Sequence, residues 1–213
     1  TALLTIENLP GLNETITVPE DIFEELTAQD ASVAGFNPYE QPTVRDLLYG
    51  VLLPSGADAC ETLARAVGGS EEGFVAMMNQ KAEELGLTNT HFENCTGLHN
   101  DNHYSTCRDI AVLMSECLKS DTFREIVTRE VYTTEATASH PEGITLYDTM
   151  LHRFTSYEMS TTLENGAVIE GGKTGFTDEA GQCLVSFAEY GGEEYILVTA
   201  EAMTDSGSAV DSI

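Results

Sequence analysis

The apolar residues of this chain recur at helical spacing through its first two thirds and at strand spacing in its last third. Thr43 is suited to cap a helix, and Pro54 would stop one. The apolar positions between them follow intervals of three and four and are Val44, Leu47, Leu48, Val51 and Leu52. The same spacing predicts helices around 60–67, over 71–85, from 107 onward and over 122–127, with 2–9 as the tail of another.

Strand character dominates the end of the chain. Residues 167–177, 183–188 and 194–200 are rich in β-branched and aromatic residues, and Tyr190–Glu193 has the glycines of a hairpin turn. Short strands are also predicted at 14–18 and 131–134, whereas 135–163 favours no element. The pattern predicts a helical lobe followed by an antiparallel sheet, the α+β class. We expect residues 204–213 to open a further element and residues 1–9 to lack their first turn.

Composition removes several function classes. Thirty-six acidic residues face nine basic ones, giving a formal net charge of −27, so no positive patch for nucleic acid can be assembled. We attribute the acidity to solubility. No run is long and apolar enough to span a membrane, and the start lacks the basic segment and cleavage site of a signal peptide. We expect export signals to be either removed or absent.

The five cysteines are scattered and odd in number, so they do not form a disulfide scaffold. One even spacing could suggest zinc. That spacing matches no common zinc pattern, and the stretch 97–103 is typical of a polar loop. We therefore expect no metal at this set, which consists of Cys95, His99, His103 and Cys107.

The stretch 167–177 carries the most distinctive chemistry. Lys173 is one of three lysines and stands among glycines and hydroxyl residues, which favours a local anion-binding spot on a strand edge. Simpler interpretations exist for each residue. Lys173 could be an ordinary exposed lysine, Thr174 and Thr177 ordinary strand formers, and Ser55, which follows Pro54, a turn residue.

The chain carries a series of motifs at 52–59, 89–94, 96–98, 103–106, 172–177 and 180–181. Taken together, these motifs resemble those of one protein family. Their order and separations are similar to those of the serine D-alanyl-D-alanine carboxypeptidases, the low-molecular-mass penicillin-binding proteins, which share a fold with class A β-lactamases. The resemblance implies one transpeptidase-like domain over 1–213, with a helical lobe at about 40–150 and a sheet formed by about 1–39 and 151–213, lacking N-terminal strands and a C-terminal helix.

The resemblance also implies roles for individual residues. Ser55 would pass a proton across the cleft, and Lys173 would supply positive potential. Thr174 and Thr177 would hold the terminal carboxylate of the substrate. Gly175 and Phe176 would lie along the bound substrate, and the Phe176 N–H would donate to the oxyanion. The implied partners are peptidoglycan stem peptides or β-lactams, outside the cytoplasmic membrane. No cofactor is implied, and any membrane association would use segments absent from this chain.

Three departures from the family pattern lead us to expect an impaired enzyme. The sequence contains no Ser-x-x-Lys, the motif that supplies the nucleophile and its base. Ala57 stands where the family has an asparagine, and no Lys or Arg follows Lys173. Two alternatives stay open: a non-catalytic module that binds peptidoglycan or penicillin and, less favoured, a β-lactamase. A Ser-x-x-Lys encoded just before Thr1 would favour a fragment of an exported carboxypeptidase over the binding module.

Overall fold

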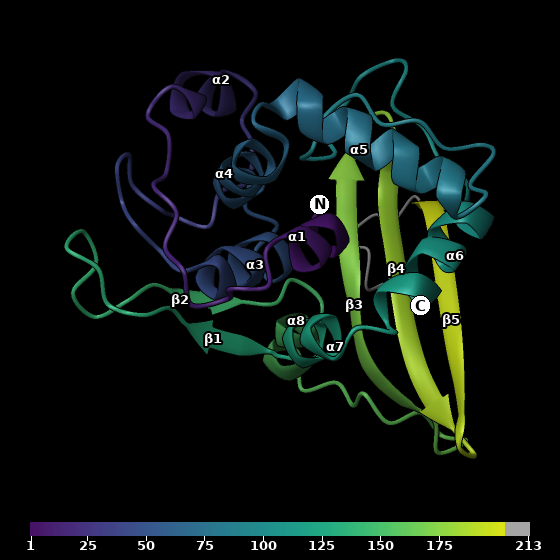
Figure 1. The fold of residues 1–213 in the computed structure, drawn as a ribbon. Helices are drawn as coiled ribbons and strands as arrows, with labels where there is room; N and C mark the ends of the chain where they lie inside the picture. Colours follow the sequence, from purple (N-terminus) through teal and green to yellow (C-terminus); the bar gives the residue numbers. More distant parts are fainter. Residues whose placement is uncertain (203–213) are drawn as a thin grey trace.

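The computed structural model describes residues 1–202, and the element predicted to open at 204–213 lies outside them. Helices dominate the chain up to residue 127 and strands dominate after it, as the apolar pattern predicts, but the pattern did not predict the elements at 22–28, 145–147 and 151–156 (Figure 1). The helices are α1 (Ala2–Asn8), α2 (Ile22–Ala28), α3 (Val44–Leu52), α4 (Ala57–Gly68), α5 (Glu71–Glu84), α6 (Cys107–Cys117), α7 (Asp121–Val127) and α8 (Leu151–Ser156). The strands are β1 (Val131–Thr133), β2 (Thr145–Tyr147), β3 (Val168–Thr177), β4 (Gly181–Tyr190) and β5 (Glu193–Ala202).

The long strands form an antiparallel sheet in the order β3-β4-β5. Gly191 and Gly192 connect the last two strands, and both have positive φ angles of 63° and 81°. Two successive left-handed residues make a turn whose twist matches that of the flanking strands, so glycine fits both positions. The predicted hairpin is confirmed, and β3 is an edge strand in the described part of the chain.

Side-chain caps fix the starts of four helices in the described part of the chain, and at α7 the Ser120 hydroxyl accepts from the Phe123 N–H. Thr43 and Asp46 form a reciprocal capping box at α3, and Ser70 accepts from the Gly73 N–H at the start of α5. Thr106 accepts from the Asp109 N–H at the start of α6. The Asp109 carboxylate does not complete a capping box there, because it accepts instead from Asn89 and Thr90.

One predicted strand is wrong. Within 14–18 only Thr15 forms a β-bridge, and its partner is Thr43. The backbone N–H groups of Ile16 and Val18 donate to the carbonyls of Pro42 and Glu40, so the segment is held by a loop rather than by a second strand. The alternating pattern reflected the burial of Val18 and not a sheet.

The sheet is covered on both faces. Alternation along β4 sends Phe187 into the main core shared with α1, α3, α4 and α7, and sends Leu184 to the other face. There Met150, Leu151 and Phe154 from the α8 segment pack against it. In Figure 1, α6 lies in front of β4 and β5, and α7 lies beside β3. The segment without a predicted element thus supplies β2 and the helix that covers the second face.

The helices of the described chain are all too short or too polar to cross a bilayer. The division into a helical lobe and a sheet portion near residues 40 and 151 stays a prediction.

Helix α1 contacts α3, α4 and α7, and its apolar side chains belong to the main core between the lobe and the sheet.

Candidate active site

Ser55 lies at the corner between α3 and α4, as predicted. Its φ angle is +60°, a left-handed conformation that costs a residue with a Cβ about 1 kcal/mol or more. Its hydroxyl accepts a hydrogen bond from the Lys173 ammonium. The structure therefore brings together two residues 118 positions apart, from the helical lobe and the sheet.

A buried carboxylate holds this corner in place. The side chain of Asp58, in the first turn of α4, accepts hydrogen bonds from the N–H groups of Ala34, Gly35 and Phe36 at 2.7 to 3.0 Å. A Cβ on Gly56 would lie 2.7 Å from Ala34, so only glycine allows this approach. The loop 34–36 thus fixes the backbone on which Ser55 stands.

Two glycines of β3 let other elements approach the strand. A Cβ on Gly171 would lie 2.4 Å from the Val127 carbonyl oxygen at the end of α7, and one on Gly172 would lie 3.0 Å from the Met150 sulfur. Gly175 differs, because an added Cβ would meet only Cys183, at an ordinary 3.8 Å. Packing therefore explains the first two glycines but does not explain Gly175.

Lys173 is half-buried, and burial lowers the pKa of its ammonium. The neighbouring Asp148 carboxyl and Cys60 thiol oppose that shift. Burial raises the pKa of Asp148 to about 6 and that of Cys60 to about 12. The Lys173 ammonium also donates to the Thr174 carbonyl at 2.8 Å. This second hydrogen bond holds the ammonium group in position beside Ser55.

The other predicted residues follow Lys173 along β3. The hydroxyl groups of Thr174 and Thr149 are hydrogen-bonded at 2.6 Å. Phe176 is 62% exposed, and Gly175 is exposed beside it. The Thr177 hydroxyl accepts from the Ala180 N–H at 3.0 Å in the turn that follows. Their substrate-binding roles stay predictions.

The site contains two residues that the sequence analysis did not find. Asp148 is fully buried and accepts from the N–H groups of Met150 and Leu151, so it fixes the start of α8 beside Lys173. Thr149 joins the Ser55 corner to β3, because its N–H donates to the Leu53 carbonyl. The available signal was an Asp just before an apolar run, which is typical of a helix start.

Ala57, at the position of the family asparagine, is only 4% exposed and is the first residue of α4. Its N–H donates to the Ser32 carbonyl at 2.8 Å. The side chain offers a buried methyl group and no hydrogen-bonding atom. The amide contact that the resemblance implies is therefore missing from this corner.

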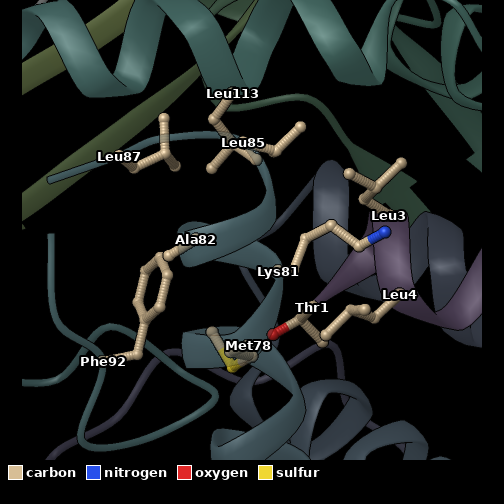
Figure 2. A pocket seen from close by; sticks show the side chains of 10 residues that line it. All are labelled: Thr1, Leu3, Leu4, Met78, Lys81, Ala82, Leu85, Leu87, Phe92 and Leu113. Carbon is tan, nitrogen blue, oxygen red and sulfur yellow. The ribbon is translucent and has the colours of Figure 1, made fainter.

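Two hollows of the molecule lie away from Ser55 and Lys173. Figure 2 shows one of about 40 Å³, lined by residues of α1, α5 and the following segment, among them Thr1, Met78, Lys81 and Phe92. The second, of about 220 Å³, lies beside Glu61 and Glu71. Neither includes the predicted site, and the groove expected between Ser55 and Lys173 stays a prediction.

The left-handed backbone at Ser55 gives a direct stability prediction. We expect the Ser55→Gly variant to be about 1 kcal/mol more stable than Ser55→Ala, because both lose the hydroxyl and only alanine keeps the Cβ that strains this conformation. Urea unfolding at one pH measures the difference. Equal midpoints for the two variants would show that the backbone at residue 55 is unstrained.

The comparisons with known proteins agree with this geometry. The family model described as D-alanyl-D-alanine carboxypeptidase, peptidase S11, matches residues 5–204. The D-alanyl-D-alanine carboxypeptidase DacF of Bacillus subtilis is 35% identical over 182 residues, which are 85% of this chain and 43% of that protein. The D-alanyl-D-alanine carboxypeptidase of Streptomyces sp. strain K15 is 35% identical over 192 residues, which are 87% of this chain and 64% of that protein. The chain thus spans about half to two thirds of the length of these relatives.

Solved structures have the same fold. The Streptomyces K15 DD-transpeptidase superposes with a TM-score of 0.82 at 31% identity, covering 99% of this chain and 82% of that one. The D-alanyl-D-alanine carboxypeptidase of Mycobacterium tuberculosis H37Rv gives 0.78 at 27% identity, covering 97% and 72%. Since a family model accounts for nearly all of the chain and the fold agrees, the chain belongs to the peptidase S11 family of D-alanyl-D-alanine carboxypeptidases.

Proposed function

We propose that this chain is the substrate-binding part of a serine-type D-Ala-D-Ala carboxypeptidase that acts on peptidoglycan stem peptides outside the cytoplasmic membrane. The observation that carries the proposal is the hydrogen bond from the Lys173 ammonium to the Ser55 hydroxyl. It joins an ammonium group and a hydroxyl group at the junction of the helical lobe and the edge strand. That junction is where the family resemblance puts the end of the peptide.

The chemistry of the site suits a short peptide that ends in a carboxylate. The lysine ammonium is half-buried, so its charge is screened less by solvent than that of a surface lysine. The exposed end of β3 offers backbone groups to an extended peptide, and Gly175 leaves space beside them. Ser55 lies within hydrogen-bond reach of Lys173 and can pass a proton to a leaving amine.

Hydrolysis by the 213-residue chain itself should be severely impaired. The nucleophile and its base would come from a Ser-x-x-Lys motif, which this sequence does not contain. The methyl group of Ala57 also cannot orient a substrate amide, and the loss of one such contact typically lowers a rate by about 10²-fold or more.

A non-catalytic binding module is the second candidate. The same two features favour it, because a site with Lys173 but no nucleophile can hold a peptide or a β-lactam reversibly. A β-lactamase ranks lower, because Ser55, Gly56 and Ala57 depart from the Ser-Asp-Asn form of that group.

Titration of the chain with an acylated D-Ala-D-Ala dipeptide, followed by NMR, tests the proposal. We expect saturable binding with shifts centred on Ser55 and the β3 residues 173–177, and no binding of the L-Ala-L-Ala isomer. In a parallel sample, a fluorescent penicillin should leave no label on the denatured chain. Equal binding of both isomers would refute substrate recognition. A covalent label would show instead that a serine of this chain is the nucleophile.

A further inference from the structure

A second group of chemically active side chains lies away from Ser55 and Lys173. Glu61 on α4, Glu71 at the start of α5 and Cys95 in the following loop bring two carboxylate oxygens and a sulfur within 4.8 Å of one another. The Thr1 hydroxyl donates to the Cys95 carbonyl at 2.6 Å, so this group also joins the start of α1. Two consecutive helices, the loop at Cys95 and the start of α1 therefore meet at one point.

The hydrogen bonds within the group leave one acceptor without a donor. The Cys95 thiol donates to Glu61 Oε1 at 3.5 Å, and the Cys95 N–H donates to Glu71 Oε1 at 3.1 Å. Glu61 is only 8% exposed, and its buried Oε2 atom has no hydrogen-bond partner. A buried carboxylate oxygen without a hydrogen-bond donor lowers the stability of the folded chain, and a bound ligand would remove that cost.

Arg65 balances only part of the local negative charge. Arg65 Nε is 3.5 Å from Glu61 Oε2 without a hydrogen bond, and the same guanidinium donates to Asp21 at 2.7 Å. One guanidinium is thus shared between the carboxylates of Asp21 and Glu61, and the Glu71 carboxylate lies beside Glu61.

A cavity of about 220 Å³ adjoins the group and has Glu61, Glu71, Glu93 and His99 on its wall. A water molecule takes up about 30 Å³ of liquid volume, so the cavity has room for an ion together with several waters. The unpartnered carboxylate therefore lies at the edge of an open, polar space.

We propose that Glu61, Glu71 and Cys95 bind one divalent transition-metal ion, with Zn²⁺ as the best match. A cysteine with two carboxylates selects zinc over magnesium or calcium, because thiolates are soft ligands. Ligand distances of about 2.0–2.3 Å require only small side-chain movements from the present positions. The thiol proton leaves to solvent on binding, and the Glu61 carboxylate gains its missing partner. Waters in the cavity complete the coordination.

This site differs from the cysteine and histidine set considered from sequence spacing. Of that set only Cys95 takes part, while Cys107 is exposed at the start of α6. The proposal does not depend on the carboxypeptidase function, because none of its ligands belongs to the Ser55–Lys173 site. Its role is to tie α4, α5 and the loop at Cys95 to the start of α1.

Metal-free protein titrated with Zn²⁺ against a chromogenic chelator tests the site. We expect one ion per chain and a higher urea midpoint in its presence. Cys95→Ser and Glu61→Gln should each lower the affinity at least tenfold, since even outer-shell changes cost about 10- to 100-fold. Cys107→Ser and Glu72→Gln are matched controls, because both residues are exposed, and they should bind as the unchanged chain does.

Cobalt provides a readout that does not need the variants to fold. Co²⁺ added to the unchanged chain should give a thiolate-to-metal charge-transfer band, which requires cysteine in the coordination sphere. Absence of that band, or equal affinity in Cys95→Ser, would overturn the proposal. So would a chain that binds no Zn²⁺ and is stabilised by Glu61→Gln, since two carboxyl groups sharing a proton would then explain the cluster.

Discussion

Replacing Lys173 by methionine should lower the affinity of the chain for an acylated D-Ala-D-Ala dipeptide by about 10- to 100-fold, since hydrogen bonds to charged groups contribute about 1.5–3 kcal/mol. Methionine keeps most of the side-chain volume but carries no positive charge and cannot donate to Ser55. The dissociation constant from NMR or calorimetric titration, at fixed salt concentration, measures the effect.

Lys119→Met is the matched control for this substitution. The Lys119 side chain is 68% exposed and, within residues 1–202, forms an ion pair with Glu116 on the same surface, so the same chemical change there should leave the affinity unchanged. A Lys173→Met variant that binds the dipeptide as tightly as the control would remove Lys173 from the site. Circular dichroism of both variants separates a loss of binding from a loss of fold.

Removal of the Asp58 carboxylate should have the largest effect on stability. Asp58→Ala leaves the N–H groups of Ala34, Gly35 and Phe36 without their acceptor, and Ala34 and Phe36 are buried. We expect the free energy of unfolding to fall by about 3–5 kcal/mol, the usual range for breaking a buried charged network. The loop 34–36 would also release the corner that carries Ser55.

Graded variants make this prediction sharper. Asp58→Asn keeps one acceptor oxygen and should fall between the unchanged chain and Asp58→Ala. Asp101→Ala should change stability by less than about 0.5 kcal/mol, because the Asp101 side chain is 98% exposed. Urea midpoints with an unchanged m-value report these differences. An Asp58→Ala midpoint equal to that of Asp101→Ala would contradict the assigned role of the carboxylate.

Local features of the sequence were enough to place most elements. Thr43, Ser70 and Thr106 cap helices where a hydroxyl residue precedes an apolar run, and Gly191 and Gly192 form the turn that a two-glycine connection favours. These signals succeed because capping and turn geometry depend on residues only a few positions apart. The prediction of a strand at 14–18 was wrong because burial of one side of a loop produces the same alternation as a strand.

The sequence by itself also determined which family the chain belongs to and that Ser55 and Lys173 should meet, since the motifs carry both. Only the tertiary structure decided what surrounds them. Asp148 and Thr149 reach the site from a segment without periodicity, and Glu61 meets Cys95 from 34 positions away. The physical reason is that an apolar pattern records whether a side chain is buried. Which atoms surround a buried side chain, and what charge those atoms carry, depends on how distant segments pack together.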